Sequence, residues 1–399
     1  MKKIKNILIL AGGDSTRFWP LKNKALFKFL GKPLIQYQIE TYKKLAENIC
    51  LVANNETLKQ IEHLRLKAKV IAQKKPNGMA GAVLSAKNGL SGETLIVNAS
   101  DIFGVDSVHQ CIDTMMALSP ELCLVFKVIK EYFPGGYFKF LGERPLEIVE
   151  KPKPEEVPSN KTRPVFDYFK NIEKFIQSIE AVTTNKDNVY EQALNNLLKQ
   201  NIKARVVEYK GDWQALKYPW HVLPMLQFFL KTLKNEVKIG KNVKIAATAK
   251  VVGPCFIDDN TIIGDFTMVR HSQIGKNCVI GGYSEITRSY LGDNVSLHRN
   301  YVGDSVLDDH VHMGAEATTA NFRFDGKFVK SAVGGAKLDT NLTKLGTVVG
   351  AHSKIGVNTT LLPGVKIGSN TFIAPGYTIA EDVEDNMFIF HKKKVRNKS

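Results

Sequence analysis

Aliphatic residues recur every six positions through the second half of the chain. The series runs from Ile239 to Val269, slips in phase before Ile274, and resumes from Val349 to Ile379. A helix repeats every 3.6 residues and an ordinary strand every two, so neither alone explains this spacing. A period of six fits a coil with three short faces per turn, each face placing one aliphatic side chain inside. The pattern predicts an all-β domain, a left-handed parallel β-helix of hexapeptide repeats.

The six-residue period sets the domain limits and exposes one interruption. The repeats predict a β-helix domain at 236–390, joined to the first domain near 232–237 and followed by a basic tail at 391–399. The period breaks between Ala315 and Leu345. An insertion in a solenoid forms a loop on one face, and such loops often carry function.

The first half of the chain, residues 1–232, alternates strand and helix patterns. Strands are expected at 7–11, 49–52, 70–73 and 94–97, the last ending near Asp101, and helices at 32–46 and 80–87. Strands separated by helices of this length imply βαβ units and a mostly parallel sheet. The first domain is therefore predicted to be a Rossmann-like α/β domain.

Charge and cysteine content narrow the function classes. The net charge of +16 suits phosphorylated ligands. A nucleic-acid partner is supported only by this charge and by the basic tail, because the sequence lacks an RNA-binding motif with aromatic residues. The five cysteines show neither metal-ligand spacing nor a disulfide framework, which favours a cytoplasmic protein with reduced thiols. The apolar run at 7–11 is too short for a signal segment or a membrane span.

A glycine-rich turn follows the first strand directly. Ala11, Gly12 and Gly13 end the apolar run, and glycines at a strand end let the backbone approach a phosphate chain. Arg17 and Lys24 would add positive charge where pyrophosphate leaves. Taken alone, glycines after a strand also fit a simple turn.

The stretch from Leu10 to Pro33, with Gly31-Lys32-Pro33-Leu34 after Lys24, resembles the signature of sugar-1-phosphate nucleotidyltransferases of the GT-A type. The resemblance implies that Ala11, Gly12, Gly13, Arg17 and Lys24 bind the nucleoside triphosphate, UTP or dTTP. It further implies roles for residues later in the chain: Gln73 and Gly78 at the nucleobase, Asp101 at Mg²⁺, and Glu150 and Lys151 at the sugar phosphate.

Three positions depart from that family's pattern. Ser15 stands where a second glycine is usual, and Arg163 begins the best match to an Asn-x-Gly segment. Ala215 replaces the aspartate that serves the family as second metal ligand, and Asp212 would point elsewhere on a strand. Both an active nucleotidyltransferase and a weakened or non-catalytic nucleotide-binding domain remain open.

The interruption of the β-helix brings together groups suited to amine acylation. His298, Tyr301 and Asn321 precede two lysines, and such a set supplies a base, polar contacts to a sugar and cations for a phosphate. The segment 298–330 resembles the acetyltransferase site of bifunctional glucosamine-1-phosphate acetyltransferase/N-acetylglucosamine-1-phosphate uridylyltransferases.

That second resemblance implies a complete acetyl-transfer site. It makes His298 the general base and acetyl-CoA the donor, and it implies a homotrimer with each site between neighbouring β-helices. The implied sugar-phosphate ligands are Tyr301, Asn321, Arg270, Arg288, Lys327 and Lys330. Two hypotheses compete with this one. The first is a nucleotidyltransferase with a single activity, whose β-helix only drives oligomerisation. The second is a non-enzymatic or regulatory relative that binds nucleotide sugar.

Overall fold

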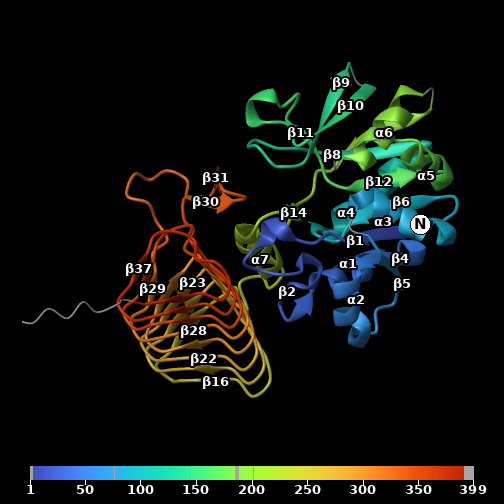
Figure 1. Cartoon of the computed structure of the whole chain (residues 1–399). Helices are drawn as coiled ribbons and strands as arrows, with labels where there is room; N and C mark the ends of the chain where they lie inside the picture. The colour runs from blue at the N-terminus through green and yellow to red at the C-terminus, as the bar shows by residue number, and fades with distance from the viewer. Residues whose placement is uncertain (1–2, 76, 143, 185–187, 201, 391–399) are drawn as a thin grey trace, which may run out of the picture. The chain divides into compact units, whose positions relative to one another are not determined.

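The computed structural model describes residues 3–75, 77–142, 144–184, 188–200 and 202–390, so the basic tail lies outside the described residues (Figure 1). The chain forms two compact units. The first unit contains Met1–Ser15, Asn23–Phe27 and Lys32–Ala215, and the second contains Thr16–Lys22, Lys28–Gly31 and Leu216–Ser399. No helix in the described part is long and apolar enough to cross a membrane.

A ten-stranded mixed sheet forms the centre of the first unit. Its order is β10-β9-β11-β8-β12-β6-β1-β4-β5, with β13 paired to β8. Its strands are β1 (Ile4–Ala11), β4 (Ala46–Asn54), β5 (Lys69–Gln73), β6 (Thr94–Asn98), β8 (Leu122–Val128), β9 (Gly136–Leu141), β10 (Arg144–Glu150), β11 (Lys161–Arg163), β12 (Phe166–Phe169) and β13 (Ala204–Glu208). The α-helices of the described residues are α1 (Leu34–Tyr42), α2 (Asn55–Ile61), α3 (Gly78–Ala86), α4 (Val105–Ala117), α5 (Ile172–Glu180), α6 (Val189–Lys199) and α7 (Val222–Lys231).

Both faces of this sheet are buried. Alternate residues of β1 enter two different cores, Ile7 and Ile9 on one face and Leu8 and Leu10 on the other. Helices α1 and α4 contribute to the first core, whereas α3, α5 and α6 contribute to the second. Strands β1, β4, β5 and β6 are parallel, so their carboxyl ends share one edge. The Rossmann-like α/β prediction is confirmed.

The expected elements of the first half appear, with changes at their ends. The helix expected at 32–46 is shorter because β3 (Lys32–Pro33) precedes α1 and β4 already begins at Ala46. The fourth strand ends at Asn98, so the expectation that Asp101 ends it is wrong. Asp101 instead begins β7 (Asp101–Phe103), which pairs with β14 (Trp213–Ala215). The apolar pattern fixes strand centres well, but the turn that separates β6 from β7 leaves no periodic signal.

The second unit contains the β-helix, whose three sheets of parallel strands are visible in Figure 1. The first sheet comprises β15 (Val237–Ile239), β18 (Cys255–Ile257), β21 (Gln273–Ile274), β24 (Tyr290–Leu291), β27 (Val306–Leu307), β32 (Val348–Val349) and β35 (Lys366–Ile367). The second comprises β16 (Lys244–Ile245), β19 (Ile262–Ile263), β22 (Val279–Ile280), β25 (Ser296–Leu297), β28 (His312–Met313), β33 (Lys354–Ile355), β36 (Phe372–Ile373) and β38 (Phe388–Ile389). The third comprises β17 (Lys250–Val252), β20 (Met268–Arg270), β23 (Glu285–Thr287), β26 (Tyr301–Gly303), β29 (Thr318–Thr319), β34 (Thr360–Leu361) and β37 (Thr378–Ile379).

The phase slip in the sequence is a shortening of the coil. Equivalent turn residues lie 18 positions apart at Asn242 and Asn260, but 17 apart at Asn277 and Asn294. These asparagines adopt positive φ angles, a backbone conformation that asparagine tolerates better than most residues, and their side chains hydrogen-bond along the coil axis. The aliphatic residues of the repeats fill the interior, so the left-handed β-helix prediction is confirmed.

The interruption of the repeats is a loop that carries a β-hairpin. Strands β30 (Lys330–Val333) and β31 (Ala336–Asp339) pair antiparallel around Gly334 and Gly335. Both glycines have positive φ angles, as a two-residue hairpin turn of this kind requires. The next coil resumes with Val348 paired to Val306. The sequence predicts the loop but not the hairpin within it.

Segments from the beginning of the chain cover the outer side of the first β-helix sheet. Phe29 stacks on Phe229 of α7 with ring centroids 5.1 Å apart and meets the Tyr290 ring edge-on at 6.1 Å. The Leu30 amide donates to Gln273 Oε1 at 2.7 Å, and Lys28 Nζ pairs with Asp293 at 2.7 Å. Residues 28–31 therefore belong structurally to the β-helix unit.

Candidate functional sites

The glycine turn of the first unit packs against a glutamine side chain. A Cβ atom on Gly12 would lie 1.7 Å from Gln73 Oε1, so any side chain there would displace the glutamine amide. Gln73 Nε2 donates to the Gly78 carbonyl at 3.0 Å, whereas its Oε1 is buried and has no hydrogen-bond partner among the described residues. The space beside Gly13 is open. Ala11 ends β1 and Gln73 ends β5, so all five predicted nucleotide-binding residues gather at the carboxyl edge of the parallel strands.

The two predicted phosphate-binding cations fall in different units. Lys24 lies in the first unit, where its amide donates to Ser15 Oγ at 3.4 Å. Arg17 lies in a 3₁₀ turn (Thr16–Phe18) that belongs to the second unit. Within the first unit, Lys24 therefore lies beside Ser15, which follows the glycine turn.

The predicted metal ligand is enclosed. Asp101 is fully buried, and its Oδ2 accepts from the Val165 amide at 3.4 Å. Ala215 pairs directly with Asp101 across the β7–β14 ladder. An aspartate at position 215, which the resemblance gives as the second metal ligand, would thus lie opposite Asp101. The alanine at this position lacks the carboxylate. Asp212 lies outside β14, and its carbonyl accepts from the Gly104 amide at 3.0 Å.

The donor set at Asp101 does not form a two-carboxylate magnesium site. No group of three histidine, cysteine or acidic side chains suited to a metal ion occurs in the described part of the chain. Mg²⁺ commonly takes one carboxylate and completes its shell with substrate phosphates and water. An ion at this position would fit only in that mode, held by Asp101 and by the phosphates of a bound triphosphate.

The predicted sugar-phosphate residues Glu150 and Lys151 lie beside a buried ionic cluster. Lys151 Nζ pairs with Glu150 at 2.9 Å, and a Cβ on Gly136 would lie 3.2 Å from Glu150 Oε2 and 3.7 Å from Arg163 Cβ. Arg163 is nearly inaccessible and is paired with Asp167 and, at 3.8 Å, with Glu191. The position expected to match the family's Asn-x-Gly segment is therefore taken up by an internal cation.

Arg163, Asp167, Tyr190 and Glu191 together form this buried ionic cluster. Tyr190 completes it by donating its hydroxyl to Asp167 Oδ2 at 2.8 Å. Burial, followed by the charge of Glu150, raises the pKa of Glu191 to about 7. Sequence reasoning missed Asp167 and Glu191 because their partners are brought together by strand pairing and by helix packing, neither of which has a local pattern.

This raised pKa predicts a pH dependence of stability. Protonated Glu191 fits the fold better than ionised Glu191, so its stabilisation is complete below about pH 4.5 and is lost as pH rises through about 7. Glu191→Gln should remove this slope. The free energy of unfolding of the variant minus that of wild type should therefore be about 3 kcal/mol larger at pH 8 than at pH 4.5. Urea unfolding at both pH values measures it. Glu180→Gln, which changes an exposed ion-paired glutamate, should keep the wild-type slope, and an equal slope in Glu191→Gln would contradict the assignment.

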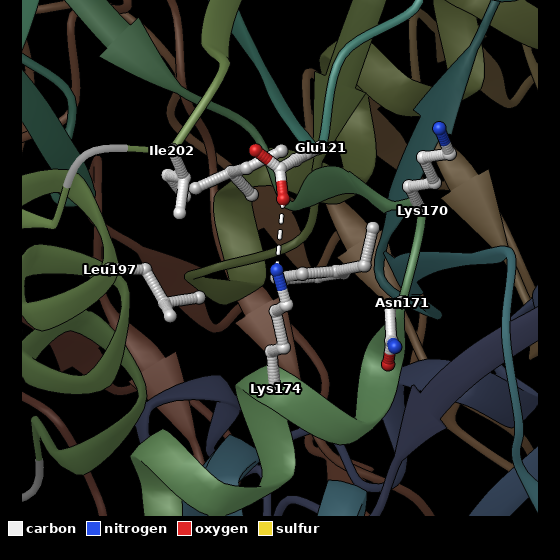
Figure 2. A pocket seen from close by; sticks show the side chains of 8 residues that line it. Glu121, Lys170, Asn171, Lys174, Leu197 and Ile202 are labelled. Atoms are coloured by element: carbon white, nitrogen blue, oxygen red, sulfur yellow. Dashed lines mark hydrogen bonds and ion pairs between the residues drawn. The ribbon is translucent and has the colours of Figure 1, made fainter.

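A separate hollow of about 380 Å³ lies at the opposite edge of the sheet (Figure 2). Its lining includes Phe169, which pairs with Thr94, the first residue of β6, and so lies away from the carboxyl ends of the parallel strands. Lys174 and Glu121 form an ion pair of 2.9 Å across it. None of the predicted nucleotide-binding or sugar-phosphate residues lines this hollow.

In the second unit, the predicted general base stands at an exposed turn after β25. The amide of His298 donates to Asn300 Oδ1 at 2.7 Å. Asn300 is buried and donates through Nδ2 to the carbonyls of Gly314 and Ala317 at 2.8 and 2.9 Å. Asn300 therefore fixes the backbone that presents the imidazole. The sequence alone assigned Asn300 no role. Its position two residues after the candidate base His298 was the one signal that could have pointed to it.

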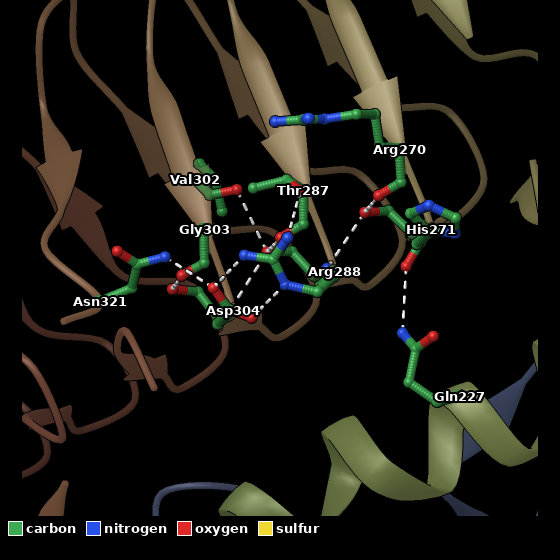
Figure 3. A network of polar contacts seen from close by, with 12 residues as sticks. Gln227, Arg270, His271, Thr287, Arg288, Val302, Gly303, Asp304 and Asn321 are labelled. Atoms are coloured by element: carbon green, nitrogen blue, oxygen red, sulfur yellow. Dashed lines mark hydrogen bonds and ion pairs between the residues drawn. The ribbon is translucent and has the colours of Figure 1, made fainter. Parts of the chain in front are cut away.

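Two of the other predicted acetyl-transfer residues, Arg288 and Asn321, converge on the carboxylate of Asp304 (Figure 3). Arg288 binds Asp304 through two hydrogen bonds of 2.6 and 2.7 Å, and Asn321 Nδ2 donates to Asp304 Oδ2 at 2.6 Å. Asn321 also lies 3.2 Å from the Tyr301 hydroxyl. The hydrogen bonds to Asp304 raise the pKa of Arg288. A Cβ on Gly303 would lie 2.6 Å from Tyr301 Oη, so this close grouping requires glycine.

The charged groups of the remaining predicted cations make no hydrogen bond or ion pair to this grouping among the described residues. Arg270 is paired with Glu285 and is about one third exposed. Lys330 begins the hairpin, and Lys327 lies on the exposed loop before it, where its amide donates to Asp325. Arg288 and Arg270 are thus already paired with carboxylates, while Lys327 and Lys330 are exposed.

Comparison with known proteins decides the family. The nucleotidyl transferase family model matches residues 6–214, and the bacterial transferase hexapeptide model matches residues 346–380. The Bifunctional protein GlmU of Methanococcus maripaludis is 31% identical over 97% of this chain and 98% of its own. The chain belongs to the nucleotidyl transferase family.

A second curated relative matches both halves of this nucleotidyl transferase. The bifunctional sugar-1-phosphate nucleotidylyltransferase/acetyltransferase of Sulfurisphaera tokodaii is 29% identical over 90% of this chain and 93% of its own. Among solved structures, a UDP-glucose pyrophosphorylase complexed with UDP-glucose aligns over 57% of this chain and 99% of its own, with 19% identity and a TM-score of 0.49. The resemblance to bifunctional enzymes that the sequence indicates is confirmed along nearly the whole chain.

Proposed function

We propose that this nucleotidyl transferase makes a nucleotide sugar in two steps. The β-helix transfers an acetyl group from acetyl-CoA to the amine of an amino-sugar-1-phosphate. The α/β unit transfers a nucleotidyl group from UTP or dTTP to N-acetylglucosamine-1-phosphate and releases pyrophosphate. The observation that carries this proposal is the polar grouping of Tyr301, Asn321, Arg288 and Asp304, which hydrogen bonds order and which a purely structural coil does not need.

In the acetyl-transfer step, His298 would take a proton from the sugar amine as the nitrogen attacks the thioester carbonyl. The new bond is the amide, the broken bond is the thioester, and coenzyme A leaves as its thiol. Asn300 supports this role because it holds the backbone on which His298 is presented. Tyr301 and Asn321 would hold the sugar, and Lys327 and Lys330, both exposed, supply positive charge for its phosphate.

In the nucleotidyl step, an oxygen of the sugar phosphate attacks the α-phosphorus, and the bond to pyrophosphate breaks. The buried Gln73 Oε1 suits an N–H group of a pyrimidine base, and the open space at Gly13 suits the phosphates. Lys24 would balance the charge of the leaving pyrophosphate, Arg17 would bind the triphosphate, and Glu150 and Lys151 would hold the sugar phosphate. Mg²⁺, when bound through Asp101, supplies further neutralisation of phosphate charge.

Exposed aromatic side chains support a homotrimer with sites between neighbouring β-helices. Phe322 and Phe328 on the inserted loop are 49% and 37% exposed, and Phe324 is fully exposed. These three rings frame the loop of Lys327, and a second copy of the chain would cover them. We also place the protein in the cytoplasm, because all five cysteines are free thiols.

The deciding experiment is pyrophosphate release from UTP or dTTP with N-acetylglucosamine-1-phosphate and Mg²⁺. Wild type should turn over, and Lys24→Ala should lose about a hundredfold in kcat because the leaving charge is no longer balanced. Lys22→Ala, two positions away and exposed, is the matched control and should retain activity. Absence of release with every nucleoside triphosphate would overturn this half of the proposal.

The competing hypothesis of a non-catalytic nucleotide-binding unit is favoured by Ala215 opposite Asp101. Ala215→Asp separates the two hypotheses in the same assay. If wild type is silent and Ala215→Asp releases pyrophosphate with Mg²⁺, the missing carboxylate has inactivated this unit. If wild type is already active, the single carboxylate suffices.

A further inference from the structure

A buried lysine in the β-helix has no role in the chemistry described above. Lys366 begins β35 and is 2% exposed. Its ammonium donates to the Ala332 carbonyl at 2.5 Å, forms an ion pair with Asp382, and lies 5.2 Å from the centroid of the Trp19 ring. Burial of an ammonium group is costly unless it is paired and hydrogen-bonded, and here every side of it is engaged.

The fold itself does not require a lysine at this place. The equivalent positions in the two preceding coils of the same sheet are Val306 and Val348, both fully covered. Valine would therefore satisfy the coil at Lys366 as well. What differs at this coil is the set of segments that cover it.

One of these segments carries a predicted triphosphate-binding residue. Trp19 lies two positions after Arg17, and its Nε1 donates to Asp385 Oδ1 at 3.1 Å. Ser369 Oγ lies 3.5 Å from the carbonyl of Pro20. Residues 16–22 are thus held on the last coils of the β-helix, with the Trp19 ring over the ammonium of Lys366.

The other segment carries a predicted sugar-phosphate ligand of the acetyl-transfer site. Ala332, whose carbonyl accepts from Lys366, lies in β30 two positions after Lys330. The neighbouring Ser331 donates to the Gly364 carbonyl at 2.8 Å, which fixes the same strand to the coil. Loss of the Lys366 ammonium would remove one of these two attachments and leave the carbonyl of Ala332 without its donor.

We propose that Lys366 is a positioning residue shared by the two predicted sites: its ammonium orders residues 16–22, with Arg17, and the β30–β31 hairpin, with Lys330, on one coil. This inference rests on the proposed function for its effect on turnover. The physical link itself, between Trp19, Lys366 and Ala332, is independent of the reaction.

Lys366→Met tests the link because methionine keeps a long apolar stem and removes all three donors. Hydrogen exchange should accelerate in peptides covering 16–22 and 330–339. The KM for the nucleoside triphosphate and the KM for the amino-sugar phosphate should each rise about tenfold, as loss of a charged hydrogen bond implies, with kcat within about twofold. Lys366→Arg, which keeps the charge and the ring contact, should restore most of both KM values.

Lys354→Met is the matched control. Lys354 also lies over an aromatic ring, 5.1 Å from the centroid of Phe372, but it is exposed and contacts neither segment. It should leave exchange and both KM values unchanged. If Lys366→Met does not fold, Asp382→Asn provides a second test. It removes the charged partner of the Lys366 ammonium while keeping the contacts of that ammonium to Trp19 and Ala332, and it should accelerate hydrogen exchange in both segments.

The inference is overturned if both segments exchange as in wild type, or if only one of them loosens, because the ammonium would then not be shared. If the segments loosen while both KM values stay unchanged in an active enzyme, the positioning role is wrong. If wild type shows neither activity, the proposed function is wrong, and hydrogen exchange alone decides whether Lys366 orders the two segments.

Discussion

His298→Ala should lower kcat for acetyl transfer to glucosamine-1-phosphate by about a hundred- to ten-thousandfold, the usual loss when a general base is removed. The imidazole is exposed at a turn whose backbone is fixed by buried Asn300, so the substitution removes the base without disturbing the coil. Release of coenzyme A thiol measures the rate. Pyrophosphate release by the other unit should not change.

His310→Ala provides the control for this experiment. His310 is also exposed on the β-helix, where its ring stacks on His352 with centroids 4.5 Å apart, and it belongs to neither predicted site. Acetyl transfer should persist in this variant. If His298→Ala retains acetyl transfer within about twofold of wild type, His298 is not the base and the acetyl-transfer proposal loses its central residue.

Arg163→Met should destabilise the first unit by about 3–5 kcal/mol, the usual cost of leaving buried charges without their partner. Asp167 is fully inaccessible and Glu191 nearly so, and both rely on the same guanidinium. Burial already raises the pKa of Asp167 despite that guanidinium, which shows how unfavourable the isolated carboxylate would be. Urea unfolding followed by circular dichroism measures the loss.

Two variants make the Arg163 prediction specific. Lys87→Met breaks the exposed ion pair with Glu180, 2.9 Å long and nearly half exposed on both sides, and should cost less than about 1 kcal/mol. Arg163→Met combined with Asp167→Leu and Glu191→Gln removes the charges together and should recover most of the stability. A loss below about 1 kcal/mol for Arg163→Met alone would show that the ionic cluster does not support the fold.

Part of the candidate sites could be predicted from sequence because the relevant residues lie next to each other or next to a strand end. The glycine turn follows β1 directly. His298 and Tyr301 lie three residues apart in one coil, His298 just after β25 and Tyr301 at the start of β26. Asn300 shows the limit of that reasoning. Its importance comes from three backbone contacts to segments on either side, and these appear only when the coil is closed.

The sequence by itself determined the two architectures of this protein. A repeat of six with aliphatic residues predicts a three-faced coil, and alternating apolar runs and helical segments predict a parallel sheet covered on both faces. These conclusions follow from short-range periodicity, which is written along the chain and does not depend on distant partners. Even the phase slip, a coil shortened from 18 to 17 residues, was legible before the structure.

Only the tertiary structure decided which distant residues meet. Strand pairing set Ala215 opposite Asp101, folding of the sheet enclosed Arg163 with Asp167 and Glu191, and the β-helix coil joined Trp19 to Lys366. These contacts span up to several hundred positions and leave no periodic trace. Their physical basis is the pairing of charges and hydrogen-bonding groups once burial has removed water, and that condition exists only in the folded chain.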